Sequence, residues 1–149
     1  MSAGIDVPRG ERLLAVADTD EGPVGGTRAA LYLRGRRIPW EQLDAAAWDS
    51  EAGVLTLTEV GTWGEPVPTH RVALSDERRL LELVRERVTA SVVLQRGFEH
   101  GRIIARRSPT GAGDVAWFVA YDAGVDPGDP VVAAAADRAL TAARGDIGE

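Results

Sequence analysis

Residues Gly35–Val60 read GRRIPWEQLDAAAWDSEAGVLTLTEV, and this stretch decides the predicted fold. In its second half, Val54–Val60, the side chains of Leu55 and Leu57 share one face, as in a half-buried strand. The residues just before, Ser50–Gly53, have the composition of a tight turn. The stretch therefore predicts a strand at Val54–Val60 that is entered through a turn.

The segment PWEQLDAAAW fits two interpretations. Its Glu, Gln, Leu and Ala residues favour a helix that begins at Pro39. A strand would instead place Trp40 and Trp48 on one face. An interpretation that combines the two is a single helical turn at Pro39–Leu43, followed by a strand through Asp49.

The rest of the chain contains further strands and two helices. Ser75 and the acidic residues after it predict the start of a helix at Asp76–Thr89. Asp129 before a proline predicts the start of a second helix, Val131–Arg144. The acidic, glycine-rich segment Asp18–Gly26 is predicted to be a connection. Strands are predicted at Glu11–Ala17, Thr27–Arg34, Arg36–Asp49 with a break at Pro39, Val54–Val60, His70–Leu74, Ser91–Leu94, Arg102–Arg107 and Val115–Tyr121.

The predicted order is five strands, a helix, three strands and a helix. Strands that follow one another in runs, without alternating helices, favour an antiparallel α+β fold over a parallel α/β sheet. A chain of 149 residues is the size of one domain. We therefore expect a single domain over residues 1–149, in which the strands and helix of residues 91–149 pack on the same core as residues 10–90.

Composition excludes several classes of chemistry. The chain has no cysteine and no lysine, which removes disulfides, thiolate nucleophiles, sulfur-ligated metals and Schiff-base catalysis. Its net charge of −6 and pI of about 5.0 argue against constitutive nucleic-acid binding. The sequence has no run of about 18 apolar residues and no apolar leader, so we expect a cytoplasmic protein.

Several motifs resemble the bacterial pleckstrin-homology-like (PH-like) domains. These are GERLL near the start, the strand LYL at Leu31–Leu33, the step GRRIPWEQLDAAAWD, a glycine turn and VLTLTEV. The resemblance implies a strongly curved antiparallel sheet or partial barrel that is followed by a helix. PH-like barrels have seven strands before that helix, whereas five are predicted here. Whether the strands at Val92–Tyr121 complete the barrel or pack beside it stays open.

The whole chain, including YDAGVDPGDP, is also similar to short uncharacterised proteins of high-GC bacteria. That similarity implies no activity.

The titratable residues give no catalytic, cofactor or metal signature. Asp122, Asp126 and Asp129 could suggest a calcium site, but turns and helix capping account for each of them. His70 and His100 are the candidate general bases, and neither has a partner that the sequence identifies. We therefore assign no catalytic, cofactor-binding or metal-ligating residue and favour a protein without enzymatic activity. The alternative is a small-molecule binder or hydrolase that uses one of the two histidines.

The predicted interaction surface consists of arginines after position 77 and one loop tryptophan. Arginines are dense between residues 78 and 107, either as a solvated surface or as a binding patch. Trp63 lies in a Gly/Pro-bounded loop, where an exposed ring indicates a partner contact. The residues predicted to bind are Trp63, Arg85, Arg96, Arg102 and Arg106. The expected function is binding of a protein partner or of a second copy of the chain, with weak contact to an anionic lipid or nucleic acid as a further alternative.

Overall fold

The structure is a computed structural model that describes residues 4–61, 67–75 and 78–148. The chain forms two compact units. The first contains the chain up to Ser91 together with Ser108–Ala112, and the second contains Val92–Arg107 and the chain from Gly113 onward. The division after Ser91 lies next to the boundary predicted at residue 90. A shared core for the two segments stays a prediction.

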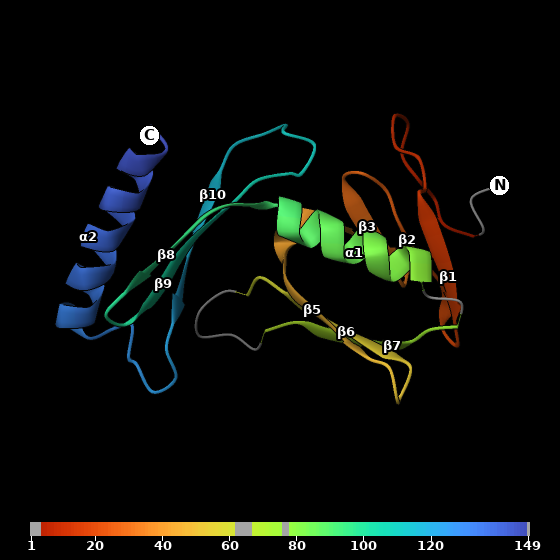
Figure 1. The fold of residues 1–149 in the computed structure, drawn as a ribbon, viewed down its shortest axis with the longest axis horizontal. Coiled ribbons are helices and arrows are strands. Elements are labelled where there is room, and N and C mark those ends of the chain that lie inside the picture. The colour runs from red at the N-terminus through yellow and green to blue at the C-terminus, as the bar shows by residue number, and fades with distance from the viewer. Residues whose placement is uncertain (1–3, 62–66, 76–77, 149) are drawn as a thin grey trace. The chain divides into compact units, whose positions relative to one another are not determined.

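Two antiparallel sheets and one helix build the first unit (Figure 1). Among the described residues, seven strands precede the helix. One sheet has the order β1-β2-β3-β4 and the other the order β5-β6-β7. The strands are β1 (Ala15–Thr19), β2 (Gly22–Gly26), β3 (Ala30–Leu33), β4 (Arg36–Pro39), β5 (Leu43–Asp49), β6 (Val54–Glu59) and β7 (Thr69–Ala73).

The prediction of five strands before the helix is therefore wrong. One reason is β2, which lies where a connection was predicted and pairs with both β1 and β3. Two of its three glycines, Gly25 and Gly26, are needed for packing. A Cβ atom on Gly25 would lie 2.8 Å from Ile5 Cδ1, and one on Gly26 would lie 2.7 Å from Leu83 Cδ2 and 3.0 Å from Trp40. The second reason is that the break at Pro39 separates two full strands.

The interpretation of the segment after Pro39 as one helical turn followed by a strand is confirmed. A single 3-10 turn at Trp40–Gln42 leads directly into β5. The Trp40 ring is fully buried, and its Nε1 donates a hydrogen bond to the carbonyl oxygen of Thr27 at 2.9 Å. Trp40 therefore lies in the turn between β4 and β5 with its indole buried and its one donor satisfied.

Helix α1 (Arg78–Ala90) closes the core of the first unit. It was predicted at Asp76–Thr89, of which residues 76 and 77 lie outside the described part. Leu80 and Val84 of α1 are buried with apolar residues from both sheets. The helix contacts β1, β2 and β5, so it covers apolar side chains that the two sheets leave uncovered. The main sheet residues of this core are Val24, Leu31, Leu33, Ile38, Leu43, Leu55, Leu57 and Val72.

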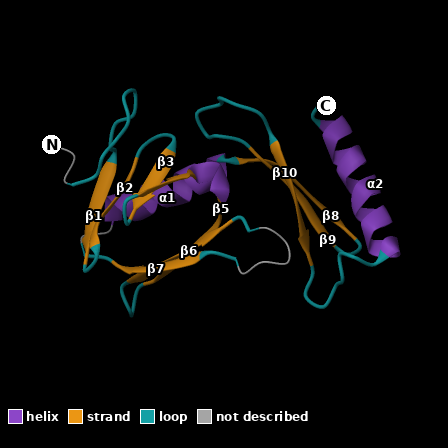
Figure 2. Cartoon of the chain, turned by 180° about the vertical axis from the view of Figure 1, so that it is seen from behind, coloured by secondary structure: helices purple, strands orange, loops and turns teal. Residues whose placement is uncertain are grey.

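The second unit is one antiparallel sheet with a helix (Figure 2). The sheet has the order β10-β9-β8, from β8 (Val92–Phe98), β9 (Gly101–Arg106) and β10 (Ala116–Tyr121). Helix α2 (Pro130–Asp146) starts as predicted, because the Asp129 side chain accepts a hydrogen bond from the Val131 amide at 2.9 Å. The Arg144 guanidinium lies 5.8 Å from the Trp117 ring centroid. The contact between Arg144 and Trp117 connects α2 with β10 of this sheet.

The predicted α+β class with antiparallel sheets and two helices is confirmed. Among the described residues, the strands form three separate sheets and not a closed barrel. In the described part of the chain, no helix is both long and apolar enough to cross a membrane.

Candidate functional site

A groove of about 480 Å³ lies between α1 and the outer strand β5 of the first unit. Its floor contains Leu55 and Val84, which are almost completely buried. Its walls contain the half-buried side chains of Trp48, Leu81 and Val88. This volume is within the range of small ligand sites, and the apolar lining suits the side chain of a hydrophobic residue.

The open edge of β5 borders this groove. Among the described residues β5 pairs only with β6. Ala46 lies on the groove side, whereas Ala45 and Ala47 point the other way by strand alternation, and all three are exposed. Soluble proteins usually protect an edge strand with charged side chains, proline or a covering segment. Three small side chains in a row leave the backbone of β5 accessible to an added strand.

The rim of the groove on α1 carries two charged residues. Glu82 is 3.7 Å from Arg78, so its carboxylate already has a cationic neighbour. Arg85 is exposed and forms no ion pair with any described residue. Thr89 lies one helical turn after Arg85 and also lines the groove. The rim therefore presents a guanidinium and a hydroxyl group, two hydrogen-bond donors, beside an apolar floor.

A polar cluster around Glu59 joins the two sheets elsewhere in the first unit. One Glu59 carboxylate oxygen lies 2.6 Å from His70 Nε2, and both oxygens accept hydrogen bonds from Arg36, at 3.2 and 3.3 Å. Burial alone would raise the pKa of Glu59. Hydrogen bonds from His70 and Arg36 outweigh that effect, so the pKa of Glu59 lies below its ordinary value.

His70 was a candidate general base in the sequence, so its surroundings test that hypothesis. Neither His70 nor Glu59 lines the groove or two further cavities of the first unit. From its position on β6, Glu59 connects Arg36 of β4 with His70 of β7.

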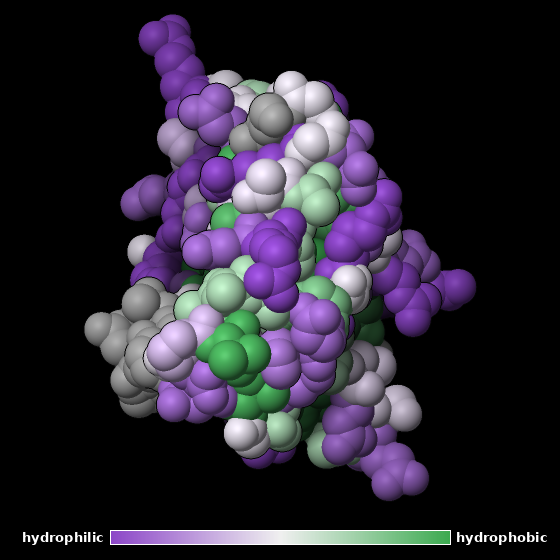
Figure 3. Space-filling view, turned by 90° about the vertical axis from the view of Figure 1, so that its left-hand side faces the viewer, coloured by the Kyte–Doolittle hydropathy of each residue, from purple (hydrophilic) through white to green (hydrophobic). Residues whose placement is uncertain are grey.

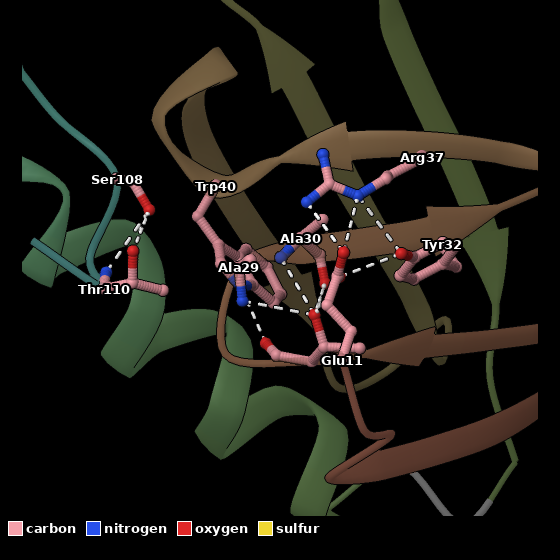
Figure 4. Close-up of polar contacts among 9 residues, drawn as sticks. Glu11, Ala29, Ala30, Tyr32, Arg37, Trp40, Ser108 and Thr110 are labelled. Atoms are coloured by element: carbon pink, nitrogen blue, oxygen red, sulfur yellow. Dashed lines mark hydrogen bonds and ion pairs between the residues drawn. The ribbon is translucent and has the colours of Figure 1, made fainter. Parts of the chain in front are cut away.

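A second polar cluster surrounds Glu11 (Figure 4). Glu11 accepts hydrogen bonds from Thr27 at 2.7 Å, from Tyr32 at 2.9 Å and from Arg37 at 3.0 Å. Burial alone would raise the pKa of Glu11, but its three donors outweigh that effect and lower it. Burial and the neighbouring Glu11 carboxylate raise the pKa of Tyr32. A cavity of about 790 Å³ lies beside Tyr32 and Arg37, but the polar groups that face it from this cluster are already paired.

The predicted arginines do not form one surface. Arg85 is on α1 of the first unit and exposed. Arg102 and Arg106 share one face of β9, although Arg102 is exposed and Arg106 is only 4% exposed. Arg96 is opposite Ile103 in the register, so it lies on the other face of that sheet, where it pairs with Asp146 at 3.4 Å. Arg85 is therefore the predicted arginine that lines a groove in the first unit.

The remaining candidates from the sequence are Trp63, His100 and Asp126. Trp63 lies outside the described residues. His100 is in the turn between β8 and β9, where its ring packs edge-on against Phe98 at 6.2 Å. Asp126 accepts a hydrogen bond from the Gly128 amide at 2.9 Å, which is the turn role predicted for it. Among the described residues, no cluster of three or more acidic or histidine side chains could hold a metal ion.

The exposed surface around α2 contrasts with the groove. Viewed from the α2 side, hydrophilic side chains predominate and hydrophobic ones form small groups among them (Figure 3). Isolated apolar side chains of this kind are normal on soluble proteins.

The sequence analysis did not identify the groove. Trp48 was considered only as a residue on one face of a possible strand. The signal that could have indicated the groove is Ala45–Ala47, three small residues in one predicted strand between two aspartates.

Comparisons with known proteins identify no relative. No family model matches the chain, and neither a curated protein nor a solved structure matches it significantly.

Proposed function

We propose that this protein is a non-enzymatic interaction module that binds an extended segment of a protein partner along β5. The observation that carries the proposal is the exposed edge at Ala45–Ala47, which among the described residues pairs only with β6, beside an apolar groove. A strand added to β5 gains backbone hydrogen bonds, and every second side chain of that strand faces the groove. Backbone pairing would provide affinity, and the groove would select the side chains.

We also propose that the first unit is a PH-like domain. Support comes from seven strands in sheets of four and three, followed by a helix that contacts both sheets. Seven strands before a helix is the number that the resemblance in the sequence implies. Under this proposal the strands of the second unit are an addition to that domain.

The test uses the full chain and a displayed library of random peptides of about a dozen residues, a length that exceeds a typical strand. Peptides selected on the wild type are measured again on Ala46→Trp, which fills the groove, and on Ala47→Trp. The Ala47→Trp variant is the matched control, because the new ring is on the same strand but points away from the groove. We expect Ala46→Trp to weaken binding by roughly tenfold or more and Ala47→Trp to change it little.

Two results would contradict the proposed function. One is a library that yields no binder. The other is a set of binders whose affinities respond equally to Ala46→Trp and Ala47→Trp, because such peptides would bind elsewhere on the chain. Circular dichroism and thermal unfolding of both variants establish that each one is folded.

A further inference from the structure

We infer that the partner segment carries an acidic residue next to its hydrophobic anchor, and that Arg85 binds this acidic side chain. The inference rests on the proposed function and specifies the partner that the groove accepts. The hydrophobic anchor enters between Trp48 and Leu81, and the carboxylate reaches the α1 rim.

The rim presents one guanidinium that can bind an anion. Of the two charged groove residues, Glu82 has Arg78 as its neighbour, whereas Arg85 has no ionic partner among the described residues. The Thr89 hydroxyl is one turn away on the same side of α1 and can donate a hydrogen bond to the same carboxylate. A guanidinium at the border of an apolar surface binds a carboxylate through two parallel hydrogen bonds. An acidic residue on the partner therefore satisfies two donor groups for which the described residues provide no carboxylate.

A second copy of the chain fits this edge less well than a separate peptide. Antiparallel pairing of two β5 strands through their alanines would place Asp44 of one copy directly opposite, or one residue from, Asp49 of the other. The same juxtaposition occurs at both ends of the pair. Like charges at opposing strand positions destabilise the pairing. Both copies also carry a net charge of −6.

The experiment compares charge reversal on the two partners. A selected peptide that loses binding to Ala46→Trp is measured against wild type, Arg85→Glu and Arg79→Glu. Arg79 is the matched control, because it is exposed on the same helix, forms no ion pair among the described residues and does not line the groove. We expect Arg85→Glu to weaken binding by roughly tenfold and Arg79→Glu to change it by less than about twofold. Replacing the acidic residue of the peptide with lysine is expected to restore binding to Arg85→Glu.

The outcomes separate the inference from the proposed function. Peptides that respond to Ala46→Trp but lack an acidic residue, or that bind Arg85→Glu as well as Arg79→Glu, would overturn the inference and leave the groove function standing. If no peptide responds to Ala46→Trp, the proposed function itself fails. Chain self-association that competes with the peptide at the groove, seen by light scattering, would identify a second copy as the occupant and overturn the inference.

Discussion

The two edges of the sheet β5-β6-β7 differ in how they are protected. The β7 edge is joined to the first sheet: the Arg71 carbonyl oxygen accepts a hydrogen bond from Arg34 at 3.0 Å, and the Ser75 amide donates to the Asp18 carbonyl oxygen at 3.4 Å. At the β5 edge, Ala45–Ala47 are exposed, and among the described residues their backbone pairs only with β6. An edge that the fold covers with its own contacts serves stability, whereas one left bare is available to a partner.

This comparison predicts that substitutions near β7 change the stability of the protein and that substitutions near β5 change binding. The largest expected loss of stability is at Glu59, whose side chain is 12% exposed. Glu59→Gln removes the charge that pairs with Arg36 and His70 and should lower the free energy of unfolding by about 2 kcal/mol. Denaturant unfolding followed by tryptophan fluorescence measures this loss.

Glu51→Gln is the control for Glu59→Gln. Glu51 is an exposed turn residue whose side chain forms no ion pair among the described residues, and its replacement should change stability by less than about 0.5 kcal/mol. Equal losses in the two variants would show that the Glu59 cluster does not hold the β7 side of the sheet.

The pH dependence of stability gives a second prediction for Glu59. Its pKa is lowered in the folded protein, so the unfolded chain takes up the proton at a higher pH than the folded chain does. The stability that Glu59 contributes is therefore fully present above the unfolded pKa and is lost as pH falls through the folded pKa. We expect the difference in unfolding free energy between wild type and Glu59→Gln to shrink on acidification through this range. Glu11, whose pKa is also lowered, changes the unfolding free energy of wild type and Glu59→Gln equally as pH falls.

Denaturant titrations at a series of acidic pH values measure this difference. Two stability curves that stay parallel down to the lowest pH at which both proteins fold would contradict the prediction.

A smaller loss of stability is expected at Arg34, which donates a hydrogen bond to the backbone of β7. Arg34→Ala removes the hydrogen bond to the Arg71 carbonyl oxygen and the ion pair with Glu21. Both contacts are partly exposed, so we expect a loss of about 0.5–1 kcal/mol. Arg28→Ala is the matched control, because Arg28 is exposed and makes none of these contacts. If Arg28→Ala lowers the free energy of unfolding as much as Arg34→Ala does, Arg34 has no special role at this edge.

Local sequence patterns predicted much of the fold. The short turn after Pro39 and the capped start of α2 follow from residues adjacent in the sequence, and both are confirmed. Strand β2 was missed because its glycines resemble a turn. Gly26 is required by Leu83 and Trp40, whose approach depends on tertiary packing.

The candidate site was less predictable because it, too, depends on tertiary packing. Arg85 was identified from the density of arginines between residues 78 and 107. The groove that it borders needs β5 to lie beside α1, and no periodicity in the sequence encodes that contact. The strand arginines were grouped by proximity in sequence, but the register places Arg96 and Arg102 on opposite faces of their sheet.

The smallest change in stability is expected at Arg85, on the β5 side. Together with its expected effect on binding, this change distinguishes the β5 edge from the β7 edge. Arg85→Glu alters an exposed residue without an ion pair among those described, so the free energy of unfolding should change by less than about 0.5 kcal/mol. The same variant is expected to lose roughly tenfold in peptide affinity. A residue whose substitution weakens binding at unchanged stability belongs to a recognition surface. If Arg85→Glu instead destabilises the protein by as much as Glu59→Gln, then Arg85 supports the fold, and the contrast between the two edges disappears.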